Sequence, residues 1–514
     1  MTVGLWNIAS EQPARPAVID AGGTTVSYGE LAARANQLVH GLRAQGLRRG
    51  DVVAAVLDNE PAMIELCLAV LQGGWYLTPI NHHLTAPEIA FILEDSGAEA
   101  LICSERLGGV CTEAARTAGL PDGVCFGTGA VSGLRSYREL FDGMPTERPA
   151  ERSAGGPMHY TSGTTGRPRG VRRAPSDADP DLVAELFTGF LGLFGIPRGE
   201  GVHLVVSPLY HTAVMVFATT SLHNGQTVVL MDRWTPEGTL HSIQRYGVTT
   251  SHMVPTQFHR LLALPEQVRS GFDVSSLSHV IHSAAPCPID VKRRMLEWWG
   301  PVIYEYYAAT EGGGTLVTPA EWLEHPGTVG RAWAGSDVRV YDDDGNPCPP
   351  RTIGTVFMSL AVADFKYHGD EEKTREGRRD GFFTVGDVGY LDEDGYLFLC
   401  DRRSDMIISG GVNIYPAEIE AVLLTHPAVG DVAVFGIPDA DWGEQVKAVV
   451  EPAEGVTAGS ALVDELLAFC RERLAGYKCP RTIDFLESLP RDPNGKLYKR
   501  RLRDPHWAMA GRSI

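Results

Sequence analysis

A short segment of hydroxyl residues and glycines, residues 161–171, has the composition of a phosphate-binding loop. Hydroxyl groups donate hydrogen bonds without adding negative charge, and glycines let an anion approach the main chain closely. Arg167 and Arg169 add positive charge, and a guanidinium group suits phosphate oxygens. The segment lacks the Gly-x-x-x-x-Gly-Lys-Ser/Thr spacing of a P-loop. We expect it to bind phosphate in another way, and a polar linker is the alternative.

A second set of candidates stands where an aromatic, a hydroxyl and a carboxylate precede three glycines. A base could stack on Tyr307, Thr310 could donate to a phosphate, and Glu311 could hold Mg²⁺. Upstream, the small residues Ala284 and Ala285 would let a flat ring lie against the backbone. Each of these features, taken singly, is also typical of a solvated turn.

Three further side chains stand beside predicted strands or turns. His211 follows a strand, which is where α/β folds place ligands, and a turn histidine satisfied by its neighbours fits equally well. Asp387 precedes a hairpin turn, where it could accept hydrogen bonds from a ribose diol or serve the turn itself. Lys496 follows the turn at 492–495, which would present it at a tip, and a solvated basic tail is the alternative.

The elements that must position these residues begin with alternating helix and strand signals. Ser27 and Thr85 each precede a Glu by three residues, the spacing of a capping box. Residues 52–57 form a continuous apolar run, as expected of a buried parallel strand, and Asn59 is predicted to cap the helix that follows. This is the βαβ pattern of a layered α/β sheet.

The pattern changes twice further along the chain. Residues 330–400 predict a β-rich segment with turns that contain Gly and Asp. Beyond residues 401–405, helices predicted at 416–425 and 461–474 alternate with strands in a unit of about 110 residues. We therefore predict two domains, residues 1–400 and 401–514, with Lys496 in the second.

The composition argues against several classes of protein. Lys and Arg total 45 against 64 Asp and Glu, and the net charge of −19 argues against nucleic acid as the main partner. The nine cysteines are scattered without a Cys-x-x-Cys pair, so neither a disulfide framework nor a structural zinc site is expected. Residues 1–20 lack the pattern of a signal peptide, and no apolar run reaches 18 residues. We expect a cytoplasmic protein without a membrane span.

Taken together, five segments resemble the motifs of the adenylate-forming superfamily, and most closely its acyl-CoA synthetase or fatty-acid–CoA ligase branch. They resemble the phosphate loop, the Tyr-Gly-x-Thr-Glu motif, the ribose and hinge motifs and the catalytic-lysine loop, at residues 161–171, 307–311, 386–390, 401–420 and 493–496. The resemblance covers nearly the whole chain. It implies an α/β protein with a large N-terminal domain of layered α/β sheets plus a β-rich subdomain, and a small mobile α+β C-terminal domain.

The resemblance also implies a role for each candidate. Lys496 would bridge the carboxylate and the α-phosphate, Thr310 would touch that phosphate, and Glu311 would hold Mg²⁺. His211 would act between the acyl pocket and the pantetheine tunnel. The other ATP-binding residues would be Thr161, Ser162, Gly163, Thr164, Thr165, Gly166, Arg169, Ala284, Ala285, Tyr307, Asp387 and Arg402. Gly410 and Gly411 would line the tunnel for CoA after the C-terminal domain rotates, and Trp442 would lie at its mouth.

The implied activity joins a hydrophobic carboxylic acid, fatty or aryl, to coenzyme A (CoA) through an acyl-AMP intermediate, with ATP, Mg²⁺ and CoA taking part. The acyl pocket should be lined by residues near 208–216, 252–258 and 306–314. Its apolar members favour a hydrophobic acid over an amino acid; they are Val214, Val216, Phe217, Met253 and Val254. No acidic residue near 253–255 suggests a partner for a substrate ammonium group. Two alternatives stay open: an enzyme that loads a carrier-protein phosphopantetheine, and a catalytically idle nucleotide-binding homologue. We expect a monomer or a homodimer.

Four positions depart from the pattern of the superfamily. Arg169 stands where Lys is usual, which keeps the charge but replaces a point charge by a planar fork. Ala308 replaces a Gly, and Ser404 occupies the hinge position, which is commonly Asp or Lys. Glu305 lies where an Asn is frequent.

Overall fold

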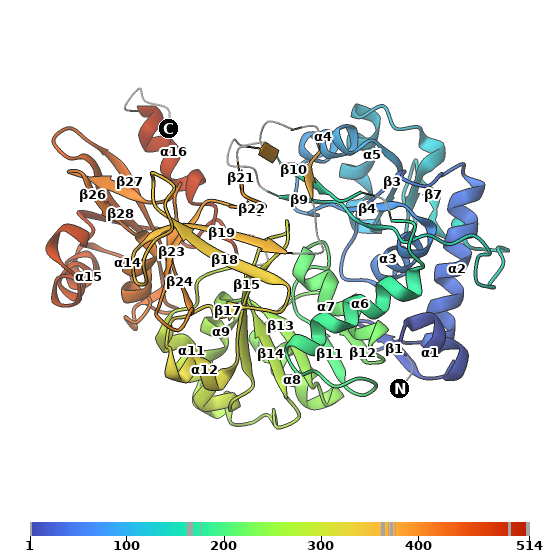
Figure 1. Ribbon diagram of the computed structural model, residues 1–514, viewed down its shortest axis with the longest axis horizontal. Coiled ribbons are helices and arrows are strands. Elements are labelled where there is room, and N and C mark those ends of the chain that lie inside the picture. The colour runs from blue at the N-terminus through green and yellow to red at the C-terminus, as the bar shows by residue number, and fades with distance from the viewer. Residues whose placement is uncertain are drawn as a thin grey trace. The chain divides into compact units, whose positions relative to one another are not determined.

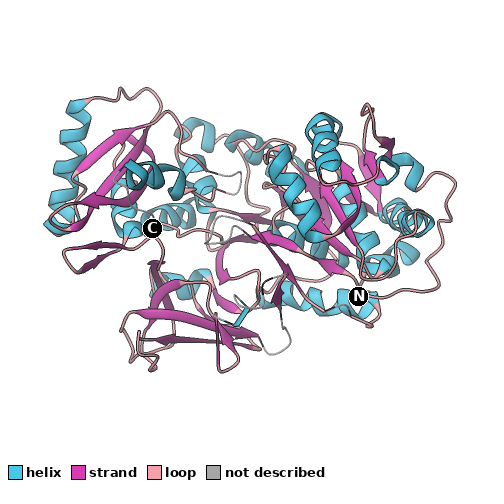
Figure 2. Ribbon diagram, turned by 90° about the horizontal axis from the view of Figure 1, so that it is seen from above, coloured by secondary structure: helices cyan, strands magenta, loops and turns pink. Residues whose placement is uncertain are grey.

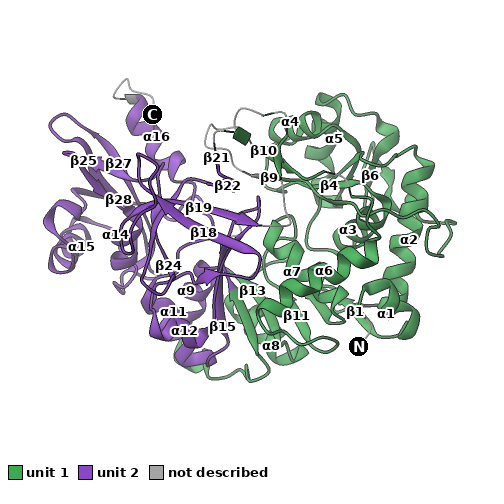
Figure 3. Cartoon of the chain, in the orientation of Figure 1, with its two compact units in different colours: residues 1–253, 264–281, 362–376 green, residues 254–263, 282–361, 377–514 purple. Residues whose placement is uncertain are grey.

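The computed structural model describes residues 3–161, 168–174, 176–360, 365–368, 370, 374–375, 377–491 and 495–509. The chain forms two compact units (Figure 3). Unit 1 contains residues 1–253, 264–281 and 362–376, and unit 2 contains residues 254–263, 282–361 and 377–514. Among the described residues, no helix combines the length and the apolar character needed to cross a membrane.

Six strands of unit 1 form a wholly parallel sheet in the order β7-β6-β5-β3-β4-β8 (Figure 1). Its strands are β3 (Val52–Val56), β4 (Tyr76–Pro79), β5 (Ala98–Cys103), β6 (Cys125–Gly127), β7 (Arg135–Ser136) and β8 (Gly156–Pro157). The helices that cover it are α2 (Tyr28–Ala44), α3 (Pro61–Gly73), α4 (Ala86–Ser96) and α5 (Gly108–Thr117).

Both faces of this sheet are buried, and Figure 2 shows helices on either side of its strands. Val53 and Ala55 of β3 join the core that α2 and α3 contribute to. Their neighbours Val52, Ala54 and Val56 join the core of α4 and α5. Because successive residues of a strand face opposite sides, a strand buried on both sides needs an unbroken apolar run. The predicted strand at 52–57 is confirmed.

The helix starts show what local sequence can and cannot predict. Both capping boxes are present: Glu30 accepts a hydrogen bond from the Ser27 amide, and Glu88 accepts one from the Thr85 amide, each at 2.8 Å. The predicted cap at Asn59 was wrong, since the N-cap of α3 is Glu60. The Asn59 side chain instead forms hydrogen bonds with the main chain of Ser207 and Leu209 in a distant loop.

A second sheet of unit 1 places the segment that carries His211. Its strands run in the order β13-β11-β12-β1-β2, all parallel except β2. They are β1 (Pro16–Ile19), β2 (Thr25–Ser27), β11 (Val202–Val205), β12 (Thr227–Leu230) and β13 (Thr250–Met253). The helices α1 (Leu5–Glu11), α6 (Pro180–Leu193), α7 (Thr212–His223) and α8 (Pro236–Tyr246) belong to this part. A small sheet of β9 (His159–Thr161), β10 (Arg169–Arg172) and β20 (Lys366–Tyr367) completes unit 1.

Unit 2 contains most of the predicted β-rich segment, residues 330–400, although residues 362–376 with β20 belong to unit 1. The strands β15 (Ile303–Ala308), β16 (Gly314–Val317) and β17 (Arg331–Ala332) pair antiparallel. Six more strands form an antiparallel sheet that includes β18 (Ser336–Tyr341), β19 (Gly354–Leu360), β23 (Asp387–Leu391) and β24 (Leu397–Arg402). Two helices of this unit, α9 (Pro255–Leu262) and α11 (Ile289–Trp299), pack against each other.

The last part of unit 2 has the elements predicted beyond residue 405. Five strands form a sheet in the order β26-β25-β28-β27, and β29 (Thr482–Phe485) pairs with β28. The others are β25 (Ile407–Ser409), β26 (Val412–Ile414), β27 (Val429–Asp439) and β28 (Gly443–Pro452). Helices α14 (Pro416–Leu423) and α15 (Ser460–Arg473) lie where helices were predicted. The basic tail forms a helix, α16 (Lys499–Met509), which packs on β27.

Candidate active site

The glycine- and hydroxyl-rich segment is anchored at both ends by paired strands. Arg169 at the start of β10 lies opposite Thr161 at the end of β9 in an antiparallel pair. The guanidinium of Arg169 forms an ion pair with Asp370 at 3.0 Å. The predicted phosphate-binding residues between these strands, Ser162 to Gly166, lie outside the described residues.

Three predicted ATP-binding residues meet in unit 2. Asp387 opens β23 and lies opposite Arg402, the last residue of β24. The Tyr307 hydroxyl donates to Asp387 Oδ2 at 2.6 Å, and Arg402 Nε lies 3.3 Å from Asp387 Oδ1. Burial raises the pKa of Tyr307 well above its usual value, and the carboxylates of Asp387 and Glu311 raise it further. The buried carboxylate is thus held between a phenol and a guanidinium.

Thr310 and Glu311 stand in the turn that joins β15 to β16. Ala308 pairs with Gly314 across this turn, and the three glycines at 312–314 all have positive φ. A Cβ on Gly314 would lie 2.0 Å from the Tyr307 carbonyl oxygen, so this approach requires glycine. Glu311 is buried, with 5% of its surface exposed. A buried carboxylate oxygen is a hard donor of the kind that Mg²⁺ prefers, and Mg²⁺ commonly takes one or two carboxylates plus phosphate oxygens.

The two alanines follow β14 (His279–His282) and have small side chains on an unusual backbone. Ala284 has φ +74°, in the left-handed region that side chains other than glycine rarely enter. Ala284 is exposed and Ala285 is half-buried. A residue without a long side chain at this strand end leaves its backbone open to a flat ring.

A buried ionic cluster lies beside these residues, and sequence analysis did not identify it. Lys292 Nζ on α11 lies 2.6 Å from Glu305 Oε2 on β15, and His282 Nε2 lies 3.3 Å from the same oxygen. Burial alone would raise the pKa of Glu305, but Lys292 and His282 lower it to about 2. The ammonium also sits 4.8 Å from the centre of the Trp322 ring. The available signal was Lys292 itself, a charge on the buried face of α11.

Lys496 lies in unit 2. It is half-buried and follows Gly495, whose φ is +76°.

Gly410 and Gly411, with φ of +58° and +80°, form the two-residue turn between β25 and β26. A Cβ on Gly410 would lie 2.4 Å from the ring of Trp442, which is itself 51% exposed. The predicted CoA-contacting residues Gly410 and Trp442 are therefore in contact with each other.

His211 is placed in unit 1, at the N-cap of α7. Its ring packs on Tyr210 at 4.2 Å between centroids, and Tyr210 meets the edge of His82 at 5.1 Å. The loop before it is held by Asn59, which donates to the Ser207 and Met231 carbonyls and accepts from the Leu209 amide at 2.8 Å.

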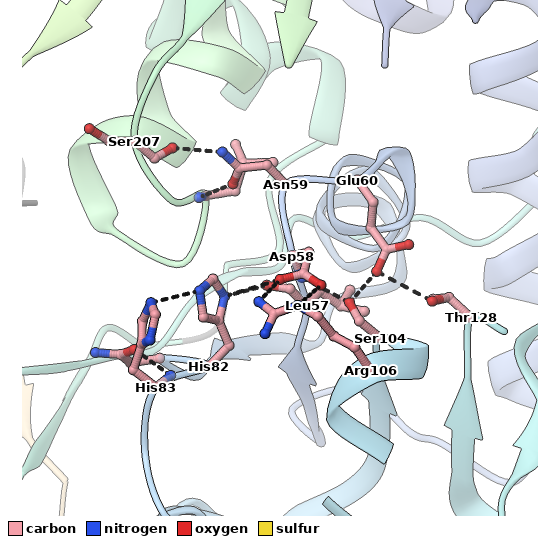
Figure 4. A network of polar contacts seen from close by, with 12 residues as sticks. Leu57, Asp58, Asn59, Glu60, His82, His83, Ser104, Arg106, Thr128 and Ser207 are labelled. Carbon is pink, nitrogen blue, oxygen red and sulfur yellow. Dashed lines mark hydrogen bonds and ion pairs between the residues drawn. The ribbon is translucent and has the colours of Figure 1, made fainter. Parts of the chain in front are cut away.

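A polar cluster missed by sequence analysis surrounds Asn59 at the carboxyl ends of β3, β4, β5 and β6 (Figure 4). Arg106 binds the Asp58 carboxylate through two nitrogens, and His82 lies 3.7 Å from the same carboxylate. Glu60 accepts hydrogen bonds from Ser104 and Thr128, and burial raises its pKa. The cluster comprises Asp58, Glu60, His82, His83, Ser104, Arg106 and Thr128. Each member follows a strand end, which was the available signal.

Comparisons with known proteins match most of the chain to AMP-binding enzymes. The model of AMP-binding enzymes matches residues 5–361, and the model of the AMP-binding enzyme C-terminal domain matches residues 418–496. A feruloyl-CoA synthase from an Amycolatopsis species is 37% identical over 94% of each chain. A fatty acid–[acyl-carrier-protein] ligase from Streptomyces coeruleorubidus is 32% identical over 98% of this chain and 96% of its own. The solved o-succinylbenzoate-CoA synthetase from Bacillus subtilis, in complex with its acyl-adenylate, matches with TM-score 0.79 and 30% identity over 98% of each chain.

Proposed function

The chain belongs to the family of AMP-binding enzymes, the adenylate-forming superfamily, and on this premise we propose that it is an AMP-forming acid–thiol ligase that joins a hydrophobic carboxylic acid to CoA. In the first half-reaction the acid attacks the α-phosphate of ATP and releases pyrophosphate, which leaves acyl-AMP. In the second, the CoA thiol displaces AMP and forms the thioester. The observation that carries the proposal is the Tyr307–Asp387–Arg402 cluster beside buried Glu311.

The residues of unit 2 divide the work of the first half-reaction. Asp387 accepts hydrogen bonds from the ribose hydroxyls while Tyr307 and Arg402 fix its carboxylate. Tyr307 and the two alanines hold the adenine, and Thr310 donates to the α-phosphate. Glu311 would hold Mg²⁺, which when bound would offset the negative charge of the phosphates. Lys496 brings its ammonium to the point where carboxylate and phosphate charges crowd together.

The acid is proposed to be hydrophobic and, in the first instance, aromatic. Of the predicted pocket residues in unit 1, Val214, Phe217 and Met253 are buried and Val216 is half-buried. In unit 1, the Phe217 ring stacks on His252 at 5.1 Å. The relative named as a feruloyl-CoA synthase supports an aromatic acid. Pyrophosphate release should be measured with hydroxycinnamic, benzoic and fatty acids, with and without CoA. Release that depends on an aromatic acid, with turnover that depends on CoA, is expected; equal inactivity with every acid would contradict the proposal.

A carrier-protein acceptor is the second candidate, because a relative named as a fatty acid–[acyl-carrier-protein] ligase aligns over almost the whole chain. The same assay decides between the two. Acid-dependent pyrophosphate release that saturates with a phosphopantetheinylated carrier protein and does not respond to free CoA would favour this candidate.

We also propose that residues 401–514 act as the mobile domain that carries Lys496. Limited proteolysis with and without an acyl-AMP analogue tests this, since cleavage near 401–405 should change when the analogue binds.

A further inference from the structure

Main-chain contacts connect described residues on either side of Lys496 in the sequence. Arg491 pairs with Leu497 in an antiparallel bridge, and the Tyr498 amide donates to the Pro490 carbonyl at 2.9 Å. Lys496 therefore lies one residue from a fixed backbone pair on one side and directly after Gly495 on the other.

The side chain of Arg491 adds a contact to the residue before Lys496. Its Nη1 donates to the Gly495 carbonyl oxygen at 2.6 Å, and that carbonyl belongs to the peptide bond with Lys496. The rest of the guanidinium binds Asp431 on β27, with Nε to Oδ2 at 2.5 Å and Nη2 to Oδ1 at 2.8 Å. Asp431 is itself fixed, because it is 6% exposed and accepts from the Val432 amide at 2.8 Å.

Gly495 also lies against the start of α9. A Cβ on Gly495 would lie 2.7 Å from Thr256 Oγ1 and 3.4 Å from Val254 Cγ2. The backbone before Lys496 is thus held between a helix and a guanidinium anchored on a buried carboxylate. A planar fork can bind a carboxylate with two nitrogens and still donate a third hydrogen bond, whereas a lysine ammonium has no such fixed geometry.

We infer that Arg491, anchored by Asp431, is a positioning residue that holds Lys496 for the acyl-AMP-forming half-reaction. The inference rests on the proposed function, in which Lys496 serves that step. A side chain placed about 1 Å off its working position can cost about 10²-fold in rate. The clamp is expected to matter for the step that uses Lys496 and to matter little for attack by the thiol on acyl-AMP already formed.

The test measures the two half-reactions separately in the full chain. Arg491→Gln should lower kcat for acyl-AMP formation by about 10- to 100-fold while KM for ATP changes less than about threefold. Thioester formation from supplied acyl-AMP should stay within about threefold of the parent enzyme. Arg491→Lys should recover only part of the loss, and Asp431→Asn should repeat it. Arg351→Gln, which removes an exposed guanidinium bound to Glu393 at 2.9 Å, is the matched control and should change neither half-reaction.

Two outcomes would overturn the inference: unchanged acyl-AMP formation in Arg491→Gln, or an equal loss in both half-reactions that follows a lowered melting temperature. The double variant Arg491→Gln/Asp431→Asn should be no slower than the worse single variant, because both act through one clamp. Lys496→Ala is run in parallel and separates the two proposals. If Lys496→Ala keeps acyl-AMP formation, the role of Lys496 in the proposed function fails; if it loses the step and Arg491→Gln does not, only the clamp fails.

Discussion

At the scale of single residues, the contact between Tyr307 and Asp387 is the one on which nucleotide binding should depend most. A hydrogen bond to a charged group contributes about 1.5–3 kcal/mol. Tyr307→Phe should therefore raise KM for ATP by about tenfold or more, with KM for the acid nearly unchanged. Tyr246→Phe on α8 removes a hydroxyl elsewhere and is the control. An unchanged KM for ATP would contradict the binding role of this cluster.

Individual site residues could be predicted where a local sequence motif identifies each of them. Tyr307, Asp387 and Arg402 were predicted from three separate segments, and the structure places them within hydrogen-bond or ion-pair distance. Arg491 was not identified, because its partner Asp431 lies 60 residues away and neither residue type is unusual where it stands. Asn59 was assigned a local role as a cap, whereas its actual partner Ser207 lies 148 residues away.

At the scale of elements, the Lys292–Glu305 pair connects α11 to β15 inside unit 2. Removing Lys292 leaves the buried Glu305 carboxylate with only His282 beside it, and removing Glu305 leaves the Lys292 ammonium buried against the Trp322 ring. Breaking a buried pair in this way costs about 3–5 kcal/mol. Lys292→Met and Glu305→Leu should each lower the free energy of unfolding by about that amount in urea titrations. The double variant should recover most of the loss. A double variant as unstable as the sum of the singles would mean that the pair contributes through packing alone.

A second prediction at this scale concerns the loop between β11 and α7. Asn59→Ala removes three hydrogen bonds that hold the segment before His211. Stability should fall by about 1–3 kcal/mol, and the preference among acids, measured as ratios of kcat/KM, should shift while KM for ATP does not. Asn346→Ala, in an exposed turn with Asp342, is the control. A changed KM for ATP with unchanged acid preference would contradict the proposed position of His211 beside the acid.

Elements were easier to predict than their connections. The strand at 52–57, the capping boxes and the helices beyond residue 405 follow from patterns of a few neighbouring residues. The order of strands does not follow from such patterns, because pairing is decided by packing between segments far apart in the chain. The core of unit 1, for example, combines residues of β3 with those of α7.

At the scale of the whole molecule, buried imidazoles should make stability depend on pH. The pKa of His203 is lowered to about 3 and those of His159 and His223 to about 4, in each case chiefly by burial. The unfolded chain takes up these protons near pH 6.5, but the folded protein does not. The contribution of these histidines to the free energy of unfolding is therefore fully present above about pH 6.5. It is lost as the pH falls toward 4, by about 1.4 kcal/mol per pH unit for each histidine.

His223 offers the sharpest test of this dependence. Its Nδ1 accepts a hydrogen bond from the Leu5 amide at 3.2 Å, which requires the neutral ring. His223→Gln keeps an acceptor without a titrating group, so its stability should fall less steeply between pH 6.5 and 4, by about 1.4 kcal/mol per pH unit. Urea titrations at several pH values measure this slope. Identical slopes in the parent protein and in His223→Gln would contradict the assignment.

The pairing of Lys292 with Glu305 also bears on how this protein can change over evolutionary time. The resemblance to the superfamily implies an Asn at position 305, and the buried partner Lys292 makes a glutamate tolerable there. A substitution of either residue alone should give a less stable protein. Among close homologues, the two positions should therefore vary together: lineages that keep the Glu should keep the Lys, and lineages with the Asn should carry an uncharged residue on the helix.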